Sequence, residues 1–187
     1  MHDSLADRTD PELAVLASRG EQGAFAVLMR RHSSRVRALL RRMGAAHVLA
    51  DDLSQDAFLA AWQAIGSFRG ESSFGTWVCR IAARLYVKRW RLDARHVLMA
   101  ETPEDPQGQG SHESASNARL DLDEAMVLLS PAERLCVSLC HGAGMSHSEA
   151  AEALRAPLGT VKSHVKRGLD KLKAHLDREG GRHVTAG

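Results

Sequence analysis

The segment from Glu101 to Ser116, ETPEDPQGQGSHESAS, constrains the fold of this chain more than any other feature of its sequence. Proline, glycine, serine and acidic residues fill the segment, and it has no large apolar side chain that could join a core. This composition is typical of a flexible linker. The sequence therefore predicts two folded domains, at residues 10–97 and 117–178, joined by a flexible linker at residues 98–116.

Both domains have the sequence pattern of α-helices. No segment alternates cleanly between apolar and polar residues, as a half-buried strand would, and alanine, leucine, arginine and glutamate are abundant. Apolar residues recur at helical spacing in the runs Phe25–Leu40, Leu53–Ile65, Phe74–Leu92 and Val161–Leu176. Every Phe, Tyr and Trp lies before residue 91, which indicates that the two domains have different cores. The predicted fold class is all-α, with two small helical domains.

Capping residues indicate where several helices begin. Asp10 is predicted to be an N-cap, with Pro11 as the first helical residue. The segments Ser130–Glu133 and Ser146–Glu149 each have the serine and glutamate of a capping box, in which each side chain bonds the backbone N–H of the other residue. Pro157 is predicted to open the last helix.

Local charge indicates a polyanionic partner, although the net charge is only +2. Residues 22–50 have six arginines and no acid, residues 80–95 have six cations and one aspartate, and so do residues 155–173. One such run could be an ordinary solvated helix face. Three runs on an otherwise balanced chain favour nucleic acid as the partner.

Several other classes of protein are disfavoured. The three cysteines, Cys79, Cys136 and Cys140, make no disulfide framework and are expected to be core residues. Cys136, Cys140 and His141 could share a metal ion, but no second ligand pair has a matching spacing, so we expect no metal and no cofactor. The sequence has no HExxH motif, nucleophile elbow or phosphate loop, so an enzyme is not expected. It also has no apolar signal segment and no apolar run long enough for a membrane span, which predicts a cytoplasmic protein.

The second domain has the pattern of a helix-turn-helix. A short predicted helix, Ser146–Leu154, is followed by a turn and then by a longer helix with a valine and leucine stripe. In this motif the first residues of the second helix lie at base edges in the major groove, where Lys, Arg, Ser and Thr can bond to bases or phosphates. The candidate residues are Thr160, Lys162, Ser163, His164, Lys166 and Arg167. The alternative is a helical hairpin with a charged outer face.

The helix predicted from Phe74 to about Arg95 has an aromatic residue beside a row of cations. Trp77 projects into a stripe about 80° wide, which also contains Arg80, Arg84, Lys88, Arg91 and Arg95. This arrangement suits a single nucleic-acid strand, because phosphates can meet the cations while bases stack on the ring. A membrane-surface helix would have its aromatics on the apolar side instead. Simple core packing is the alternative role for Trp77, and Tyr86 and Trp90 are expected in the core or at its rim.

Three segments resemble one known family. GTVKSHVKRGLDKL, which starts at Gly159, resembles the −35-reading helix of extracytoplasmic-function (ECF, group 4) sigma factors. ADDLSQDAF, residues 50–58, is similar to the AEDLxQExF motif of these proteins, and FRGESSFGTW, residues 68–77, is similar to their FxGxSSFxTWL motif. The segments occur in the family's order and on both sides of the predicted linker. Two departures are that Arg84 and Lys88 stand where the family often has Asn and Asp, and that His164 stands where it usually has Arg.

The resemblance implies an alternative sigma factor, with region 2 at residues 10–97 and region 4 at residues 117–178. Such a protein binds core RNA polymerase, through the β′ clamp helices and the β flap, and directs it to promoter DNA with −10 and −35 elements, in a stress or envelope response. A cognate anti-sigma factor is also implied as a partner. The main alternative is a helix-turn-helix regulator that binds duplex DNA without polymerase, and a third is an adaptor that binds an acidic protein.

The resemblance also implies roles for individual residues. The polymerase-docking residues would be Asp52, Leu53, Gln55, Asp56 and Phe58. The loop that holds a flipped base of the −10 element would consist of Phe68, Arg69, Gly70, Glu71, Ser72 and Ser73. The −10 strand would also contact Trp77, Arg80, Arg84, Lys88 and Arg91. In the −35-reading helix, Gly159 joins the candidates named above.

Overall fold

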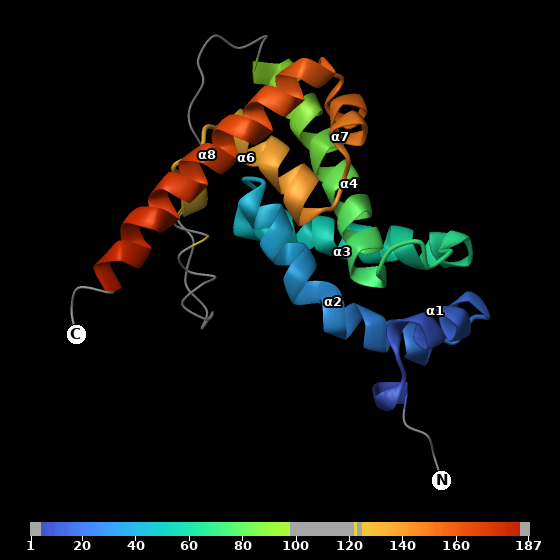
Figure 1. Cartoon of the computed structure of the whole chain (residues 1–187). Coiled ribbons are helices and arrows are strands. Elements are labelled where there is room, and N and C mark those ends of the chain that lie inside the picture. The colour runs from blue at the N-terminus through green and yellow to red at the C-terminus, as the bar shows by residue number, and fades with distance from the viewer. Residues whose placement is uncertain (1–4, 98–121, 123–124, 184–187) are drawn as a thin grey trace. The chain divides into compact units, whose positions relative to one another are not determined.

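The computed structural model describes residues 5–97, 122 and 125–183, and it shows helices but no strands in these ranges. The predicted all-α fold is confirmed. The chain forms two compact units, one with helices α1 to α4 and one with helices α6 to α8 (Figure 1). The linker predicted at residues 98–116 lies outside the described residues.

The N-terminal unit is a helical bundle. A short 3-10 turn, η1 (Leu5–Asp7), precedes α1 (Asp10–Ser18), and a second such turn, η2 (Ile65–Ser67), follows α3. Its longer helices are α2 (Gln22–Arg42), α3 (His47–Ala64) and α4 (Phe74–Val97). Helix α3 packs along α4, and α1 packs against α4 and η2.

The core of this unit centres on the aromatic ring of Phe74, the first residue of α4, which is only 1% exposed. Its ring centroid lies 6.2 Å from that of Phe25, 5.8 Å from that of Phe68 and 5.7 Å from that of Trp77. Phe25 in turn lies 5.1 Å from Trp62 of α3. Such pairs contribute about 0.5–1.5 kcal/mol each beyond the burial of their area. Ring packing therefore joins α2, α3, α4 and the loop before α4.

The start of α1 differs from the prediction by one residue. Thr9, with extended backbone angles, is the N-cap, and Glu12 accepts hydrogen bonds from its backbone nitrogen (2.8 Å) and its hydroxyl (2.7 Å). Asp10 is the first helical residue, because its carboxylate is bound instead by Arg31 and His32 of α2. The local pattern Thr9-x-x-Glu12 could have identified this cap, because a Ser or Thr followed three residues later by Glu is a known signature of a helix start.

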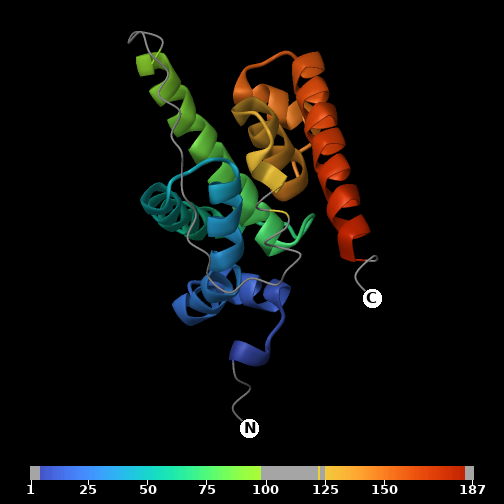
Figure 2. The ribbon, with the colours of Figure 1, turned by 90° about the vertical axis from the view of Figure 1, so that its left-hand side faces the viewer.

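The C-terminal unit contains a helical turn at residues 125–127, then α6 (Pro131–Val137), a π-helical turn η3 (Ser138–Gly142), α7 (His147–Leu154) and α8 (Leu158–His183). Figure 2 shows α8 as one continuous helix, and it packs on both α6 and α7. The core contains fully buried Leu139 and Val161 and a cluster of Ala125, Met126, Leu129, Val137 and Leu172.

Both predicted capping boxes of this unit are confirmed. At α6 the backbone nitrogen of Glu133 donates to Ser130 Oγ (3.3 Å), and that of Ser130 donates to Glu133 Oε2 (3.0 Å). At α7 the corresponding distances between Ser146 and Glu149 are 3.2 and 2.7 Å. Each box satisfies backbone donors that a helix start leaves without an intrahelical acceptor.

We expect Phe74→Ala to lower the free energy of unfolding of the N-terminal unit by about 3–5 kcal/mol, because it removes the ring on which Phe25, Phe68 and Trp77 pack. Urea unfolding followed by tryptophan fluorescence measures this unit selectively, since all three tryptophans lie in it. Phe68→Ala is the matched control and should cost less, because Phe68 is only half-buried. Equal costs would contradict the central position of Phe74.

Candidate nucleic-acid interface

The predicted polymerase-docking residues of α3 divide into two groups. Asp52, Gln55 and Asp56 are exposed, whereas Leu53 and Phe58 are buried, at 7% and 4% exposure. The ring of Phe58 packs edge-on against Phe25, at 6.5 Å between centroids. Leu53 and Phe58 therefore fix α3 on the core of its own unit, and of the five predicted residues the three polar ones offer side chains to a partner.

Two apolar residues that the sequence prediction omitted lie on the same stripe of α3. Val48 is 75% exposed and Leu59 is 58% exposed. Successive helical residues are rotated by about 100°, so both project within a narrow sector together with Asp52 and Gln55. The helical positions alone could have identified them, because each is an apolar residue on a polar stripe. This exposed stripe combines acceptors with apolar contact area.

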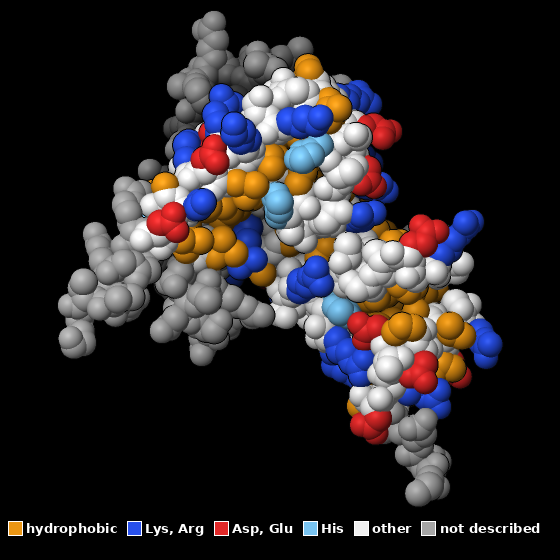
Figure 3. Space-filling view, in the orientation of Figure 1, with side chains coloured by type: hydrophobic (Ala, Val, Ile, Leu, Met, Phe, Trp, Pro, Cys, Tyr) orange, Lys and Arg blue, Asp and Glu red, His pale blue; other side chains and the backbone are white. Residues whose placement is uncertain are grey.

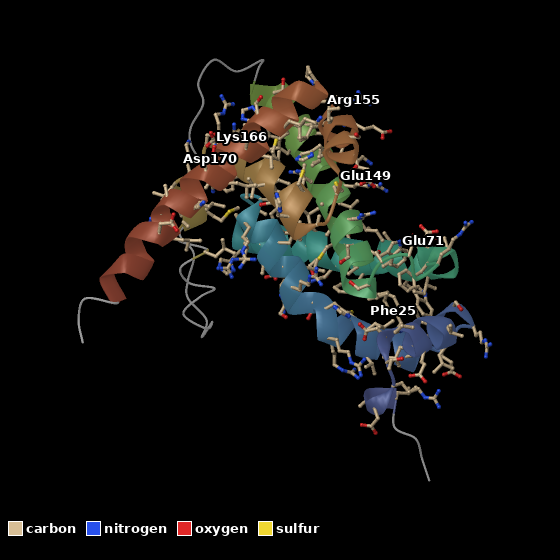
Figure 4. The ribbon with its side chains drawn as sticks, viewed as in Figure 1. Phe25, Glu71, Glu149, Arg155, Lys166 and Asp170 are labelled. Atoms are coloured by element: carbon tan, nitrogen blue, oxygen red, sulfur yellow. The ribbon has the colours of Figure 1, made fainter. Side chains whose placement is uncertain are left out.

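The loop before α4 exposes charged side chains and is closed by a serine cap. Arg69, Gly70 and Glu71 are exposed, and Gly70 has a left-handed backbone (φ +72°), which favours glycine. Ser73 Oγ accepts a hydrogen bond from the backbone nitrogen of Thr76 (3.2 Å), and it donates to Thr76 Oγ1 (3.0 Å). Ser73 thus caps the start of α4. Arg69 and Glu71 are exposed to solvent, and the position of Glu71 is marked in Figure 4.

Trp77 is packed on one part of its ring and exposed on another. Its centroid lies 5.2 Å from that of Phe68 and 5.7 Å from that of Phe74, and the residue is partly exposed. Core packing and base stacking were alternatives for this residue. The geometry is compatible with both, because packing against Phe68 and Phe74 holds a ring whose remaining surface is accessible.

The cations of α4 differ in exposure. Arg84 and Lys88 are exposed, whereas Arg80 and Arg91 are partly buried. Tyr86 is buried, as expected, but Trp90 is 42% exposed. The apolar stripe of α4 also ends earlier than predicted, because Leu92 is exposed. The side chain of Arg95 lies outside the described residues. Among the cations predicted to contact the −10 strand, Arg84 and Lys88 are therefore the exposed ones, and Arg89, which the prediction omitted, is exposed as well.

A carboxylate of α1 holds a histidine against the start of α4. Asp10 Oδ2 lies 2.6 Å from His32 Nε2, and Asp10 Oδ1 lies 2.8 Å from Arg31 Nη1. The His32 ring lies 5.5 Å from that of Phe74 and fills the space beside Gly75, where a Cβ would be 2.7 Å from Nδ1 of His32. Partial burial raises the pKa of Asp10, but hydrogen bonds from Arg31 and His32 lower it more, so it lies below the usual 3.8.

The helix-turn-helix of the C-terminal unit exposes the predicted reading residues together. Arg155 ends α7 in the left-handed conformation (φ 52°), and Ala156 N donates to Ala151 O (3.0 Å) to close the turn. Val161 and Val165 of α8 are buried. The exposed residues at the start of α8 are Gly159, Thr160, Lys162, Ser163, Lys166 and Arg167, and His164 is partly exposed. Figure 3 shows Lys and Arg side chains spread over the surface of α8.

One predicted reading residue also has contacts within its own unit. Arg167 Nη2 lies 3.1 Å from His164 Nδ1, and Arg167 Nε lies 3.8 Å from Glu133 Oε1 of α6. Glu133 Oε2 accepts a hydrogen bond from Lys171 Nζ at 2.7 Å. That bond lowers the pKa of Glu133, as does the bond from Ser130, against the opposing effect of burial. Sequence reasoning assigned Glu133 a capping role alone.

Cys79 and Cys136 are buried, as expected of core residues, whereas Cys140 is partly exposed. Burial raises the pKa of Cys136 to about 11 and also raises the pKa of Cys79 and Cys140. Across residues 5–97, 122 and 125–183, His, Cys, Asp and Glu form no group of three that could hold a metal ion. Nor is any helix in the described part of the chain both long enough and apolar enough to cross a membrane.

Comparison with known proteins identifies the family. The family model of Sigma-70 region 2 matches residues 28–96, and that of Sigma-70 region 4 matches residues 125–174. The RNA polymerase sigma factor NccH of Alcaligenes xylosoxydans xylosoxydans is 35% identical over 89% of this chain and 94% of its own length. The chain belongs to the ECF sigma factors. The ECF RNA polymerase sigma-E factor of Escherichia coli K12 is 29% identical over 88% of this chain and 92% of its own.

Solved structures agree with the sigma-factor fold. CnrH, in complex with the cytosolic domain of CnrY, has a TM-score of 0.53 at 28% identity and covers 90% of this chain and 97% of its own. RpoE from Bartonella quintana, in complex with the anti-sigma factor NepR, has a TM-score of 0.56 at 24% identity. This match covers 82% of this chain and 96% of the RpoE chain. This sigma factor therefore directs core RNA polymerase to promoters, and the interpretation as a stand-alone regulator is disfavoured.

We expect Asp10→Asn to lower the free energy of unfolding of the N-terminal unit by about 1–2 kcal/mol at pH 7, because it weakens two charge-assisted hydrogen bonds. Since the folded pKa lies below the unfolded value, the charged carboxylate stabilises the unit fully above about pH 4. This contribution is lost as the pH falls through the folded pKa. Urea unfolding followed by tryptophan fluorescence from pH 7 to pH 3 should show the two proteins converging. A constant difference would contradict the role of the Asp10 charge.

Proposed function

We propose that this sigma factor docks on core polymerase through α3, holds the −10 element on α4 and its preceding loop, and reads the −35 element with α8. The observation that carries the proposal is that each of the three resembling segments presents a set of exposed polar side chains. On α3 these are Asp52, Gln55 and Asp56. On α8 they lie at the start of the second helix of the helix-turn-helix, which is the part that enters the major groove.

The −10 surface combines a packed ring with exposed cations. Trp77 is held by Phe68 and Phe74 and can stack on a base, while Arg84 and Lys88 can bind phosphates. The loop Phe68–Ser73 provides the pocket for an extruded base. Extrusion costs a few kcal/mol, which stacking and edge contacts offset.

The proposal includes a cognate anti-sigma factor. CnrH was solved with the cytosolic domain of CnrY. CnrH is 28% identical to this chain, and the match covers 90% of this chain. A partner of the same kind would keep this sigma factor from the polymerase until a signal releases it. We place the protein in the cytoplasm, where core polymerase is found.

We expect Asp52→Arg combined with Asp56→Arg to abolish binding to purified core polymerase, because the change reverses the charge of the exposed α3 stripe. The fold should be retained, since both side chains are exposed. Glu21→Arg, an exposed acid outside α3, is the control and should bind normally. Unchanged affinity of the double variant would disprove docking through α3.

We expect Arg167→Ala to weaken −35-dependent transcription by about 1–3 kcal/mol, the usual cost of losing a good base contact. Run-off transcription with core polymerase should be compared on promoters with and without the −35 motif. Equal losses on both would mark Arg167 as a phosphate contact, and no loss on either would remove it from the interface.

A further inference from the structure

Glu133 is a buried carboxylate with more partners than a helix cap needs. The residue is 5% exposed, which is uncommon for glutamate unless it is paired. One oxygen, Oε2, accepts from the Ser130 backbone at 3.0 Å and from Lys171 Nζ at 2.7 Å. The other, Oε1, faces Arg167 Nε at 3.8 Å. A capping glutamate of α6 therefore also contacts two cations of the DNA-reading helix.

Gly168 allows this contact by bringing α8 close to α6. A Cβ at this position would lie 2.7 Å from Val137 Cγ2, 3.1 Å from Leu129 Cδ2 and 3.6 Å from Glu133 Cβ. Glycine inside a helix lowers stability by about 1 kcal/mol relative to alanine. Gly168 therefore does not serve helix formation, and its role is to let α8 lie close to α6. Arg167 precedes Gly168 and Lys171 follows it by one helical turn, and both reach the same carboxylate.

Arg167 is held at two points although 59% of its side chain is exposed. Nε lies within ion-pair distance of Glu133 Oε1, at 3.8 Å, while Nη2 lies 3.1 Å from His164 Nδ1. Because a guanidinium can only donate, Arg167 is the donor in a hydrogen bond between these two atoms. A free arginine side chain has about 2 kcal/mol of rotamer entropy to lose on binding. Contacts that exist before DNA arrives reduce that cost.

We propose that Glu133 is a positioning residue for the −35 contact, which orients the Arg167 guanidinium from the protein side. This inference rests on the proposed role of Arg167 in −35 recognition. Glu133 lies on α6 and is nearly covered, so it acts through Arg167 and does not itself touch DNA. Lys171 balances the charge of the carboxylate and is a structural partner.

A double-mutant cycle in run-off transcription tests the inference. Glu133→Gln keeps the shape of the side chain and removes its charge, and it should lower −35-dependent transcription about three- to tenfold, a range typical of coupled neighbours. In an Arg167→Ala background the same change should have no further effect on −35-dependent transcription. A merely structural loss would instead add to that of Arg167→Ala and would also lower transcription from a promoter without the −35 motif.

Two matched controls separate positioning from capping and from stability. Glu149→Gln weakens the equivalent capping box of α7 and should leave the dependence on the −35 motif unchanged. Lys171→Met removes the structural partner and should reduce stability, measured by circular dichroism, without a −35-specific loss. Glu133→Asp retains the charge but withdraws it from Arg167, so it should reproduce the −35-specific loss if Glu133→Gln fails to fold.

The outcomes distinguish this inference from the proposed function. If Arg167→Ala has no −35-specific effect, the proposed role of Arg167 fails and the inference with it. A different outcome is that Arg167→Ala causes the −35-specific loss of transcription while the Glu133 variants either cause no such loss or add an independent one. In that case only the positioning role of Glu133 is overturned.

Discussion

The burial of Phe74 is the interaction on which the N-terminal unit depends most. This ring is the first residue of the helix proposed to hold the −10 element, and it contacts rings from α2, from the preceding loop and from the next turn of α4. Phe68 and Trp77 are both functional candidates and both pack on it. The geometry of the proposed DNA surface is therefore set by the core, because its aromatic members are extensions of one buried cluster.

In the C-terminal unit, charged groups fix the geometry of the proposed DNA-contacting surface. Glu133 is buried, yet each of its oxygens faces a donor or a cation, so the cost of removing a carboxylate from water is offset. The close approach at Gly168 brings these groups together. Both units thus connect a proposed DNA-contacting side chain to a buried partner, through aromatic packing in one and through a carboxylate in the other.

The sequence predicted the features that depend on local spacing. Helical periodicity, the capping boxes of α6 and α7 and the exposed start of α8 are confirmed, since each depends on residues within about one or two turns. Features that depend on distant partners were missed. The ion pairs of Asp10 with α2 have no local signature, and nothing in the spacing connects Glu133 with Lys171, 38 residues away. The N-cap of α1 was a different kind of error, because the local pattern Thr9-x-x-Glu12 was present and was not used. The exposure of Leu92 and Trp90 was missed for another reason. Helical periodicity shows which face of α4 is apolar, but it does not show how much of that face the other helices cover.

The placement of the thiols, two buried and one partly exposed, has a consequence for their oxidation. Only a thiolate reacts readily with oxidants, and a pKa of about 11 leaves on the order of one Cys136 in ten thousand ionised at neutral pH. Cys79 and Cys140 are shifted in the same direction. Peroxide would therefore modify these side chains slowly. Oxidation of its own cysteines would therefore be a slow way to change the activity of this sigma factor.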